Sequence, residues 1–313
     1  MTDQEFVAMQ KSTAVRSRQL PWSMQLLRPA FAALSAVAPT IAAPVAERLF
    51  LTPPRHPQPA HEAMALASAR VRQIDASPIT AWVWGDGPIV LLVHGWGGRG
   101  AQLAPFVPSL VASGHSVVTF DAPGHGNSPG RRSSLLAFVD AIHAVHRALG
   151  PVRGVIAHSI GAAATARALR DGLPAEVAVF LAPPADLTLH ADIMLEALGF
   201  GRRTRELMRE RVERRLGVPW STLDVAAFAP EMRTPLLVIH DRDDAEVPWQ
   251  EGAIIAQAWP GATLSTTSGL GHRRLVRDRE VVRQAVSFAL ATLHERRPAR
   301  RPAAEPIMAS STA

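Results

Sequence analysis

The chain has 313 residues and a formal net charge of +6, and it contains no Cys, no Tyr and a single Lys, Lys11. These absences exclude disulfides, Cys-ligated zinc, iron–sulfur clusters, thiolate nucleophiles and the lysines of P-loop and kinase sites. Apolar residues make up 47% and charged residues 19%, which is typical of a globular chain. Covalent chemistry would therefore fall to Ser, Thr, Asp, Glu or His.

Residues 1–60 are predicted to form a helical arm that packs on the rest of the molecule. Residues 29–46 carry no charge, but their three prolines make them a poor membrane-spanning helix. A signal peptide ending near Ala43 is an alternative, although the polar segment before its apolar region would be long and would contain Asp3 and Glu5. We expect a cytoplasmic protein, with export or peripheral membrane contact by the arm as alternatives.

Short apolar runs between residues 61 and 293 predict eight strands, most of them aliphatic runs of the kind buried on both faces. They span residues 70–74, 79–84, 89–93, 116–120, 153–157, 177–181, 236–240 and 262–266. Stretches with helical spacing separate the later strands, at residues 101–113, 134–149, 160–171, 249–258 and 274–293. This alternation predicts an α/β fold with a mostly parallel twisted sheet and helices on both faces.

Residues 183–230 interrupt the alternation and predict a helical cap insertion over the carboxyl ends of the strands, with helices at 191–198 and 203–216. Between Arg202 and Arg215, around the second helix, the chain carries seven Arg and three Glu. Most of this charge is expected to pair on the helix surface, through Arg202/Glu206, Arg209/Glu213 and Glu210/Arg214. A surface for acidic substrates is the alternative.

Residues 294–313 are predicted to be a disordered basic tail. Its arginines are not interleaved with aromatic residues, so it offers no stacking platform for single-stranded nucleic acid. The two ends hold most of the net charge, and we expect no nucleic-acid partner. The sequence leaves the oligomeric state open.

The strongest chemical signal lies in residues 154–164, where an apolar strand runs into Ser159 and then into a helix of small residues. A Ser in a sharp strand-to-helix turn is the arrangement of a nucleophile elbow, of general form G-x-S-x-G. Ala157 stands at the first Gly of that form. The alternative is a Ser that only caps the helix.

A glycine-rich turn, HGWGGRG at residues 94–100, follows the third predicted strand. Its backbone can curve so that N–H groups face a developing oxyanion, and the N–H groups of Trp96 and Ile160 are the predicted pair. The substrate is expected to contact His94, Gly95, Trp96 and His158. Phosphate binding by this turn is the alternative.

A carboxylate and a histidine follow two later strands, in DRDDAEVP at residues 241–248 and GLGH at residues 269–272. The histidine can act as the general base of a triad and the carboxylate can orient it, in the chain order Ser, Asp, His. Together with HGWGG, DAPGHGNS at residues 121–128 and AHSIGA, these motifs resemble the α/β-hydrolase family over residues 70–293.

The resemblance implies that Ser159 is the nucleophile, His272 the base and Asp244, four residues before Pro248, the acid. Three other carboxylates are alternatives for the acid: Asp241, Asp243 and Asp186. The loop at residues 121–128 is expected to be structural and to border the pocket.

The expected function is a serine hydrolase that cleaves small-molecule carboxylic esters through an acyl-enzyme, without a cofactor. An acyltransferase or thioesterase with the same triad is the alternative, and a silent binding protein is a third. No metal site is expected, because His125, His143 and His146 have no converging third ligand in the sequence pattern.

Overall fold

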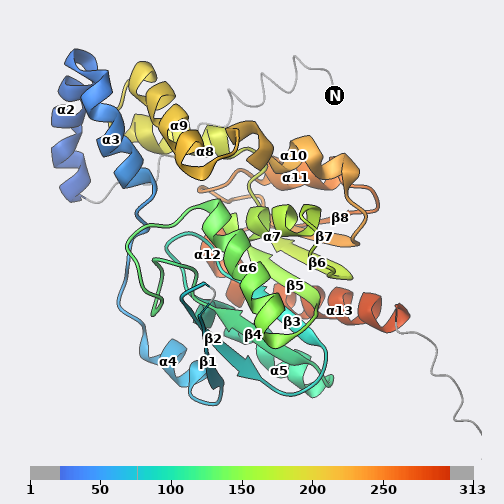
Figure 1. Ribbon diagram of the computed structural model, residues 1–313. Helices are drawn as coiled ribbons and strands as arrows, with labels where there is room; N and C mark the ends of the chain where they lie inside the picture. The colour runs from blue at the N-terminus through green and yellow to red at the C-terminus, as the bar shows by residue number, and fades with distance from the viewer. Residues whose placement is uncertain (1–21, 76, 297–313) are drawn as a thin grey trace, which may run out of the picture.

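The computed structural model describes residues 22–75 and 77–296, and these form one eight-stranded sheet with helices on both faces (Figure 1). The strand order is β1-β2-β4-β3-β5-β6-β7-β8; β1 and β2 are antiparallel to their neighbours, and β3 to β8 run parallel. The strands are β1 (Arg70–Ile74), β2 (Ile79–Trp84), β3 (Ile89–Val93), β4 (Ser116–Phe120), β5 (Val152–His158), β6 (Val177–Leu181), β7 (Leu236–Asp241) and β8 (Thr263–Thr267). The predicted mostly parallel α/β fold is confirmed, and no strand end differs from its predicted position by more than one residue.

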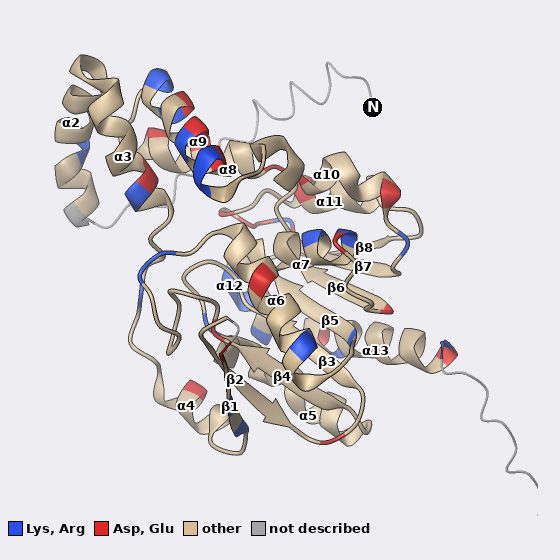
Figure 2. Ribbon diagram, viewed as in Figure 1, with Lys and Arg blue, Asp and Glu red and all other residues tan. Residues whose placement is uncertain are grey.

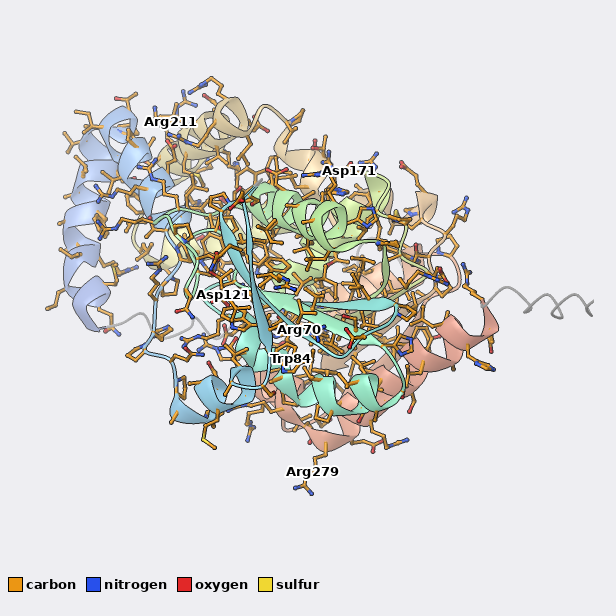
Figure 3. All side chains as sticks on the ribbon, turned by 60° about the horizontal axis from the view of Figure 1, so that its bottom comes forward. Arg70, Trp84, Asp121, Asp171, Arg211 and Arg279 are labelled. Atoms are coloured by element: carbon orange, nitrogen blue, oxygen red, sulfur yellow. The ribbon has the colours of Figure 1, made fainter. Side chains whose placement is uncertain are left out.

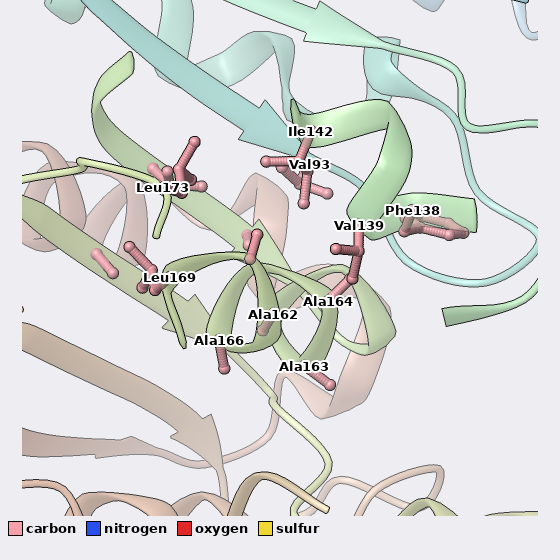
Figure 4. Packing of buried hydrophobic residues seen from close by; sticks show 14 of the residues in the cluster. Val93, Phe138, Val139, Ile142, Ala162, Ala163, Ala164, Ala166, Leu169 and Leu173 are labelled. Atoms are coloured by element: carbon pink, nitrogen blue, oxygen red, sulfur yellow. The ribbon is translucent and has the colours of Figure 1, made fainter. Parts of the chain in front are cut away.

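Alternate residues of the central strands point into two separate hydrophobic cores. In β3, Leu91 and Val93 belong to one core while Val90 and Leu92 belong to the other. The first core is covered by α6 (Leu135–Leu149), α7 (Ile160–Arg170), α10 (Val225–Phe228) and α11 (Trp249–Ala258), and Figure 4 shows the packing of α6 and α7. The second is covered by the 3-10 helix η1 (Gly100–Phe106), α5 (Val107–Ala112) and α13 (Arg279–Glu295). The central strands are therefore covered on both faces, as their continuous apolar sequences predict.

Two predicted helices are each divided in the structure. The stretch predicted as a helix at 101–113 is η1 followed by α5, because Pro105 has no N–H for an α-helical bond. The stretch at 274–293 is the end of α12 (Gly271–Arg274), η4 (Leu275–Arg277) and then α13. Asp278 ends η4 and caps α13 by accepting the N–H groups of Glu280 and Val281. A local cap therefore interrupts a continuous helical pattern.

The chain between β6 and β7 is helical, with α8 (Leu187–Ala197), α9 (Arg202–Leu216), η2 (Trp220–Leu223), α10 and η3 (Ala229–Glu231). Before β1 lie α2 (Trp22–Val37), α3 (Pro39–Phe50) and α4 (Ala60–Leu66). Helices α2 and α3 pack beside α8 and α9, far from them in sequence, and share a third core with them (Figure 1). Phe31 stacks on Phe200 with ring centroids 5.1 Å apart, and Ala42, Ala46 and Met208 are fully buried. The arm and the insertion thus form one four-helix unit.

A buried carboxylate joins the two halves of this four-helix unit. Glu47 of α3 accepts hydrogen bonds from Arg211 at 2.7 Å and Arg215 at 2.6 Å, both on α9 (Figure 3 labels Arg211). Burial alone would raise the pKa of Glu47, but the two arginines outweigh it and hold that pKa below its ordinary value. Ser35 and Thr204 also share a hydrogen bond of 2.8 Å across the same contact.

The charges of α9 therefore pair partly within the helix and partly with other elements. The predicted pairs Arg202/Glu206 and Glu210/Arg214 form at 3.7 and 3.9 Å. Arg209 does not pair with Glu213 as predicted: it contacts Asp192 of α8 at 2.8 Å.

Glu251 of α11 anchors the start of the insertion. It accepts the N–H of Ala185 at 2.8 Å and contacts Nε2 of His190 at 2.8 Å. Burial would lower the pKa of His190, but Glu251 outweighs it and the pKa lies above its ordinary value. Nearby, burial and Asp186 raise the pKa of Asp224 to about 6.

The predicted basic tail falls mainly at residues 297–313, outside the described residues, as do residues 1–21. In the described part of the chain, no helix is long and apolar enough to cross a bilayer.

Candidate active site

Ser159 lies at a sharp turn between β5 and α7. Its backbone has φ 55° and ψ −130°, a strained conformation for a residue with a side chain. The turn requires small neighbours: a Cβ on Gly161 would lie 2.3 Å from the carbonyl oxygen of His94, and one on Gly95 would lie 2.9 Å from the Cβ of Ser159. The adjacent strand and helix therefore approach too closely for larger residues, which explains the pattern of small residues in the sequence.

The structure brings Ser159, His272 and Asp244 into one hydrogen-bonded chain. Nε2 of His272 lies 3.0 Å from Oγ of Ser159, and Nδ1 of His272 lies 2.8 Å from Oδ2 of Asp244. The carboxylate can only accept, so Nδ1–H donates to it and Nε2 is left to accept from the serine hydroxyl. His272 is thus held in the tautomer that a general base requires.

Asp244 is held in its ionised form by four donors. Its Oδ1 accepts the N–H groups of Glu246 and Val247 at 2.8 and 2.9 Å. Burial would raise the pKa of Asp244, but hydrogen bonds from His240 and His272 outweigh it and lower the pKa below its ordinary value. Nε2 of His240 lies 3.4 Å from Oδ2 of Asp244 and donates to the carbonyl of Val247 at 2.9 Å.

The three alternative carboxylates lie elsewhere and have other partners. Asp241 is fully buried and accepts the N–H groups of Leu270 and Gly271 at 3.0 and 2.9 Å, directly before His272. Asp243 accepts the N–H of Gly269 at 2.7 Å, and Asp186 caps α8. Asp241 and Asp243 therefore brace the loop that carries His272, a role that the sequence reading did not assign to them.

Of the two predicted oxyanion donors, Ile160 directly follows Ser159, and Trp96 follows Gly95, which lies against Ser159. Within the described residues, the N–H groups of Trp96 and Ile160 donate to no backbone or side-chain acceptor. His94 fixes the turn before Trp96: its Nε2 accepts the N–H of Ala122 at 3.0 Å, so Nδ1 carries the proton and donates to the carbonyl of Gly95 at 2.7 Å. Burial lowers the pKa of His94 to about 4, so the ring is neutral. Among the described residues, these two N–H groups therefore stay available as donors.

The loop at residues 121–128 contacts this turn through hydrogen bonds. The expectation that it borders the pocket is wrong for the cavity described below, because it contributes no described lining residue. Asp121 accepts the N–H groups of Gly100 and Asn127 at 2.8 and 2.7 Å. The ring of His125 lies edge-on to Trp96, with centroids 5.3 Å apart. The buried hydrogen bonds of this loop support its predicted structural role.

His158 lies against the ring of His272, with ring centroids 4.6 Å apart. Its Nε2–H donates to the backbone carbonyl of His272 at 3.0 Å. Burial lowers the pKa of His158 to about 3, so it is neutral and does not compete for the serine proton. It holds the backbone of His272 in place.

A cavity of about 530 Å³ opens at Ser159 and His272. The four predicted contact residues His94, Gly95, Trp96 and His158 all line it; Ile160 does not. None of its described lining residues comes from the predicted cap insertion at 183–230. The segment before β1 lines the cavity instead, through Pro54, His56, His61, Glu62 and Ala65.

Four charged side chains line that cavity: Glu62, Glu246, Arg273 and Arg277. Glu62 is buried and contacts Arg99 at 3.4 Å, and Arg99 donates to the carbonyl of His56 at 2.7 Å. Arg273 pairs with Glu246 at 2.7 Å, and Arg277 also lines the cavity. Sequence reading missed these residues, because only the tertiary fold brings residues 54–65 to the serine.

A profile of the Alpha/beta hydrolase family matches residues 90–285. The chain belongs to that family. Its sequence is 29% identical over 253 residues to "Putative carbamate hydrolase RutD" of Pseudomonas syringae pv. syringae (strain B728a), covering 66% of this chain and 95% of the relative.

Solved structures share the fold of this alpha/beta hydrolase. An esterase (EaEST) from Exiguobacterium antarcticum matches with a TM-score of 0.54 and 15% identity, over 70% of this chain and 98% of that one. The bromoperoxidase from Bacillus anthracis matches with a TM-score of 0.53 and 22% identity, over 72% of this chain and 100% of that one. At these identities the matches show the fold.

Other histidines have structural contacts. Nδ1 of His146 accepts the N–H of Val152 at 3.3 Å, and Nδ1 of His125 donates to the carbonyl of Pro123 at 3.0 Å. Among residues 22–75 and 77–296, no three His, Asp or Glu side chains are grouped so that they could hold a metal ion.

Proposed function

We propose that this protein is a serine hydrolase that cleaves small-molecule carboxylic esters through an acyl-enzyme. The observation that carries the proposal is the unbroken chain from Ser159 Oγ through His272 to Asp244, at 3.0 and 2.8 Å, at the end of an open cavity. Membership of the hydrolase family and an esterase-like fold support it.

In the first half-reaction, His272 Nε2 accepts the proton of Ser159 as Oγ attacks the ester carbonyl. The carbonyl oxygen becomes an oxyanion beside the N–H groups of Trp96 and Ile160, each worth about 3 kcal/mol in the transition state. Asp244 stabilises the imidazolium without taking its proton. The tetrahedral intermediate then expels the alcohol, which receives the proton from His272, and leaves an acyl-Ser159.

In the second half-reaction, water attacks the acyl-Ser159 while His272 takes one of its protons. Collapse of the second tetrahedral intermediate returns that proton to Oγ of Ser159 and releases the carboxylic acid. Water can reach the acyl carbon, because the cavity is open and partly lined by charged side chains such as Glu62 and Arg277.

A carbamate is a second substrate class for the same site, favoured by the similarity to the carbamate hydrolase named above. Attack by Ser159 on the carbamate carbonyl would form the same kind of oxyanion. The resulting carbamoyl-enzyme would be hydrolysed in the same way.

A fluorophosphonate probe tests the nucleophile. We expect covalent labelling of the wild-type protein, loss of labelling in Ser159→Ala and full labelling in Ser113→Ala, a matched change at an exposed helix end. Folded wild-type protein that resists the probe and cleaves no p-nitrophenyl ester would overturn the proposal.

A substrate panel then tests the reaction type. It compares p-nitrophenyl esters of increasing acyl length, a p-nitrophenyl carbamate and acyl thioesters, each with and without added alcohol. Release of free acid from the esters supports hydrolysis. Dominant formation of a new ester with added alcohol would show an acyltransferase, and preferred turnover of thioesters a thioesterase.

A further inference from the structure

A buried carboxylate, that of Glu62, lines the cavity that opens at Ser159. Glu62 is the acidic residue of α4, a helix with no Lys, Arg or second acid (Figure 2). Its side chain is 10% exposed, and its Oε2 lies 3.4 Å from Nε of Arg99. This contact is ionic only, and neither oxygen of Glu62 accepts a hydrogen bond from residues 22–75 or 77–296. Buried carboxylates normally accept hydrogen bonds, so Glu62 keeps an unused capacity for a ligand that donates.

The side chain of Gln102 supplies a donor in the same part of the cavity. Gln102 lies on η1, which packs against α4, and it also lines the cavity. Its Oε1 accepts the backbone N–H of Arg99 at 3.4 Å, so the other end of the amide is the NH₂ group. Within the described chain, that NH₂ group donates to no acceptor. Arg99 thus contacts both Glu62 and Gln102, and brings an unused acceptor and an unused donor to one region of the wall.

This region lies close to the nucleophile, because the glycine-rich turn at residues 94–100 connects them. A Cβ on Gly95 would lie 2.9 Å from the Cβ of Ser159. The N–H of Gly98 donates to the carbonyl of Gly95 at 3.0 Å, and a Cβ on Gly98 would lie 2.6 Å from Oε1 of Gln102. A substrate group only a few bonds from the reacting carbonyl can therefore reach this part of the wall.

We propose that Glu62 and Gln102 form a subsite for a hydroxyl group of the substrate, so that hydroxyl-bearing esters are the preferred substrate class. The proposal rests on the proposed ester hydrolysis and narrows it. A hydroxyl group both donates and accepts, so it can donate to the carboxylate of Glu62 and accept from the amide of Gln102. An ammonium group fits less well, because it cannot accept and because Arg99 already balances the charge of Glu62. A carboxylate on the substrate cannot donate to Glu62 and is repelled by it.

Pairs of esters that differ only in a hydroxyl or a methyl group test the subsite. The full chain is given hydroxyethyl butyrate or propyl butyrate, and methyl ω-hydroxyalkanoates or methyl alkanoates of the same length, and the released acid is titrated. We expect kcat/KM to be about tenfold to a hundredfold higher for the hydroxyl member of the best pair. Equal turnover in every pair would overturn the subsite and leave ester hydrolysis intact, whereas turnover of no ester at all would overturn both. Better turnover of the matching methyl ω-aminoalkanoates would assign Glu62 to a cation and would also overturn the proposal.

Two variants assign the preference to these side chains. Gln102→Met removes the donor at similar size, and Glu62→Met/Arg99→Met replaces the ion pair with apolar groups, so that neither charge is left buried alone. Each should bring the ratio of the two kcat/KM values toward one, and fluorophosphonate labelling verifies that the nucleophile is intact. The control Arg153→Met/Glu176→Met replaces an ion pair, joined at 2.6 Å, whose residues are not among the described lining of the cavity. It should keep the wild-type ratio. A wild-type ratio in both subsite variants, or an equal loss in the control, would overturn the proposal.

Discussion

Two single substitutions, Asp244→Asn and Asp241→Asn, separate the acid that orients His272 from the acid that braces its loop. Both carboxylates are buried and each has four hydrogen-bond donors, so a generic loss of a buried charge would affect them alike. Their contacts predict different outcomes.

In Asp244→Asn, the amide oxygen can still accept the N–H groups of Glu246 and Val247. The amide NH₂ then faces Nδ1 of His272, which must accept instead of donate. The proton moves to Nε2, and His272 can no longer take the proton of Ser159. We expect kcat to fall about 10⁴-fold, as expected for a wrong-tautomer base.

In Asp241→Asn, the amide oxygen keeps the N–H groups of Asp243 and Gly271, and Thr267 can turn its hydroxyl to accept. The N–H of Leu270 is left facing an amide N–H at about 3 Å. This unmade bond and the lost charge should cost about 2–4 kcal/mol of unfolding free energy. The tautomer of His272 is unaffected, so kcat should fall no more than about tenfold.

Steady-state kinetics on the best p-nitrophenyl ester and urea unfolding of the same preparations give both quantities. The expected result is a large kinetic loss with Asp244→Asn and a mainly thermodynamic loss with Asp241→Asn. If folded Asp241→Asn loses as much kcat as Asp244→Asn, the assignment of the acid to Asp244 is wrong.

Three further changes test other contacts. Glu47→Gln should lower the free energy of unfolding by about 1–2 kcal/mol, a modest loss because its arginine partners are half-exposed. Glu210→Gln, at an exposed pair, should change it by less than about 0.5 kcal/mol. Equal effects would contradict a stabilising role for the contact of Glu47 with Arg211 and Arg215. Gly161→Ala should lower the free energy of unfolding by about 3 kcal/mol or prevent folding, because the added Cβ meets a backbone carbonyl. Gly201→Ala should change it by less than about 1 kcal/mol, and thermal unfolding compares the two variants. The pKa of His190 lies above its ordinary value of 6.5, so its contribution is complete below pH 6.5 and lost as pH rises through the folded pKa. Unfolding measured against pH should show this loss, His190→Gln should remove it, and a wild-type curve that overlays that of the variant would refute it.

The sheet could be predicted from the sequence because its signal is local. Continuous aliphatic runs such as 89–93 are incompatible with an exposed surface, and the turn around Ser159 requires small residues at fixed positions. Helix ends were less predictable. The cap at Asp278 and the missing N–H of Pro105 each override a helical pattern of apolar residues.

The cavity wall and the four-helix unit could not be predicted, because each depends on contacts between distant segments. Nothing near Glu47 indicates that its partners are Arg211 and Arg215, more than 160 residues away. In the same way, His240 lies in an ordinary apolar strand and contacts Asp244 only because the following loop folds back. The sequence predicted a helix near α9 and a helical arm that packs on the rest of the molecule, but not that the arm packs on α9.

The wall of the cavity formed by residues 54–65 lies outside the part of the chain that the family profile covers, residues 90–285. The two regions can therefore diverge at different rates in evolution. Homologues that are alike over residues 90–285 can carry unrelated sequences at residues 54–65. Under the proposed function, grafting residues 51–66 from one homologue to another, with Ser159 and His272 untouched, is the natural route to a change of substrate selectivity.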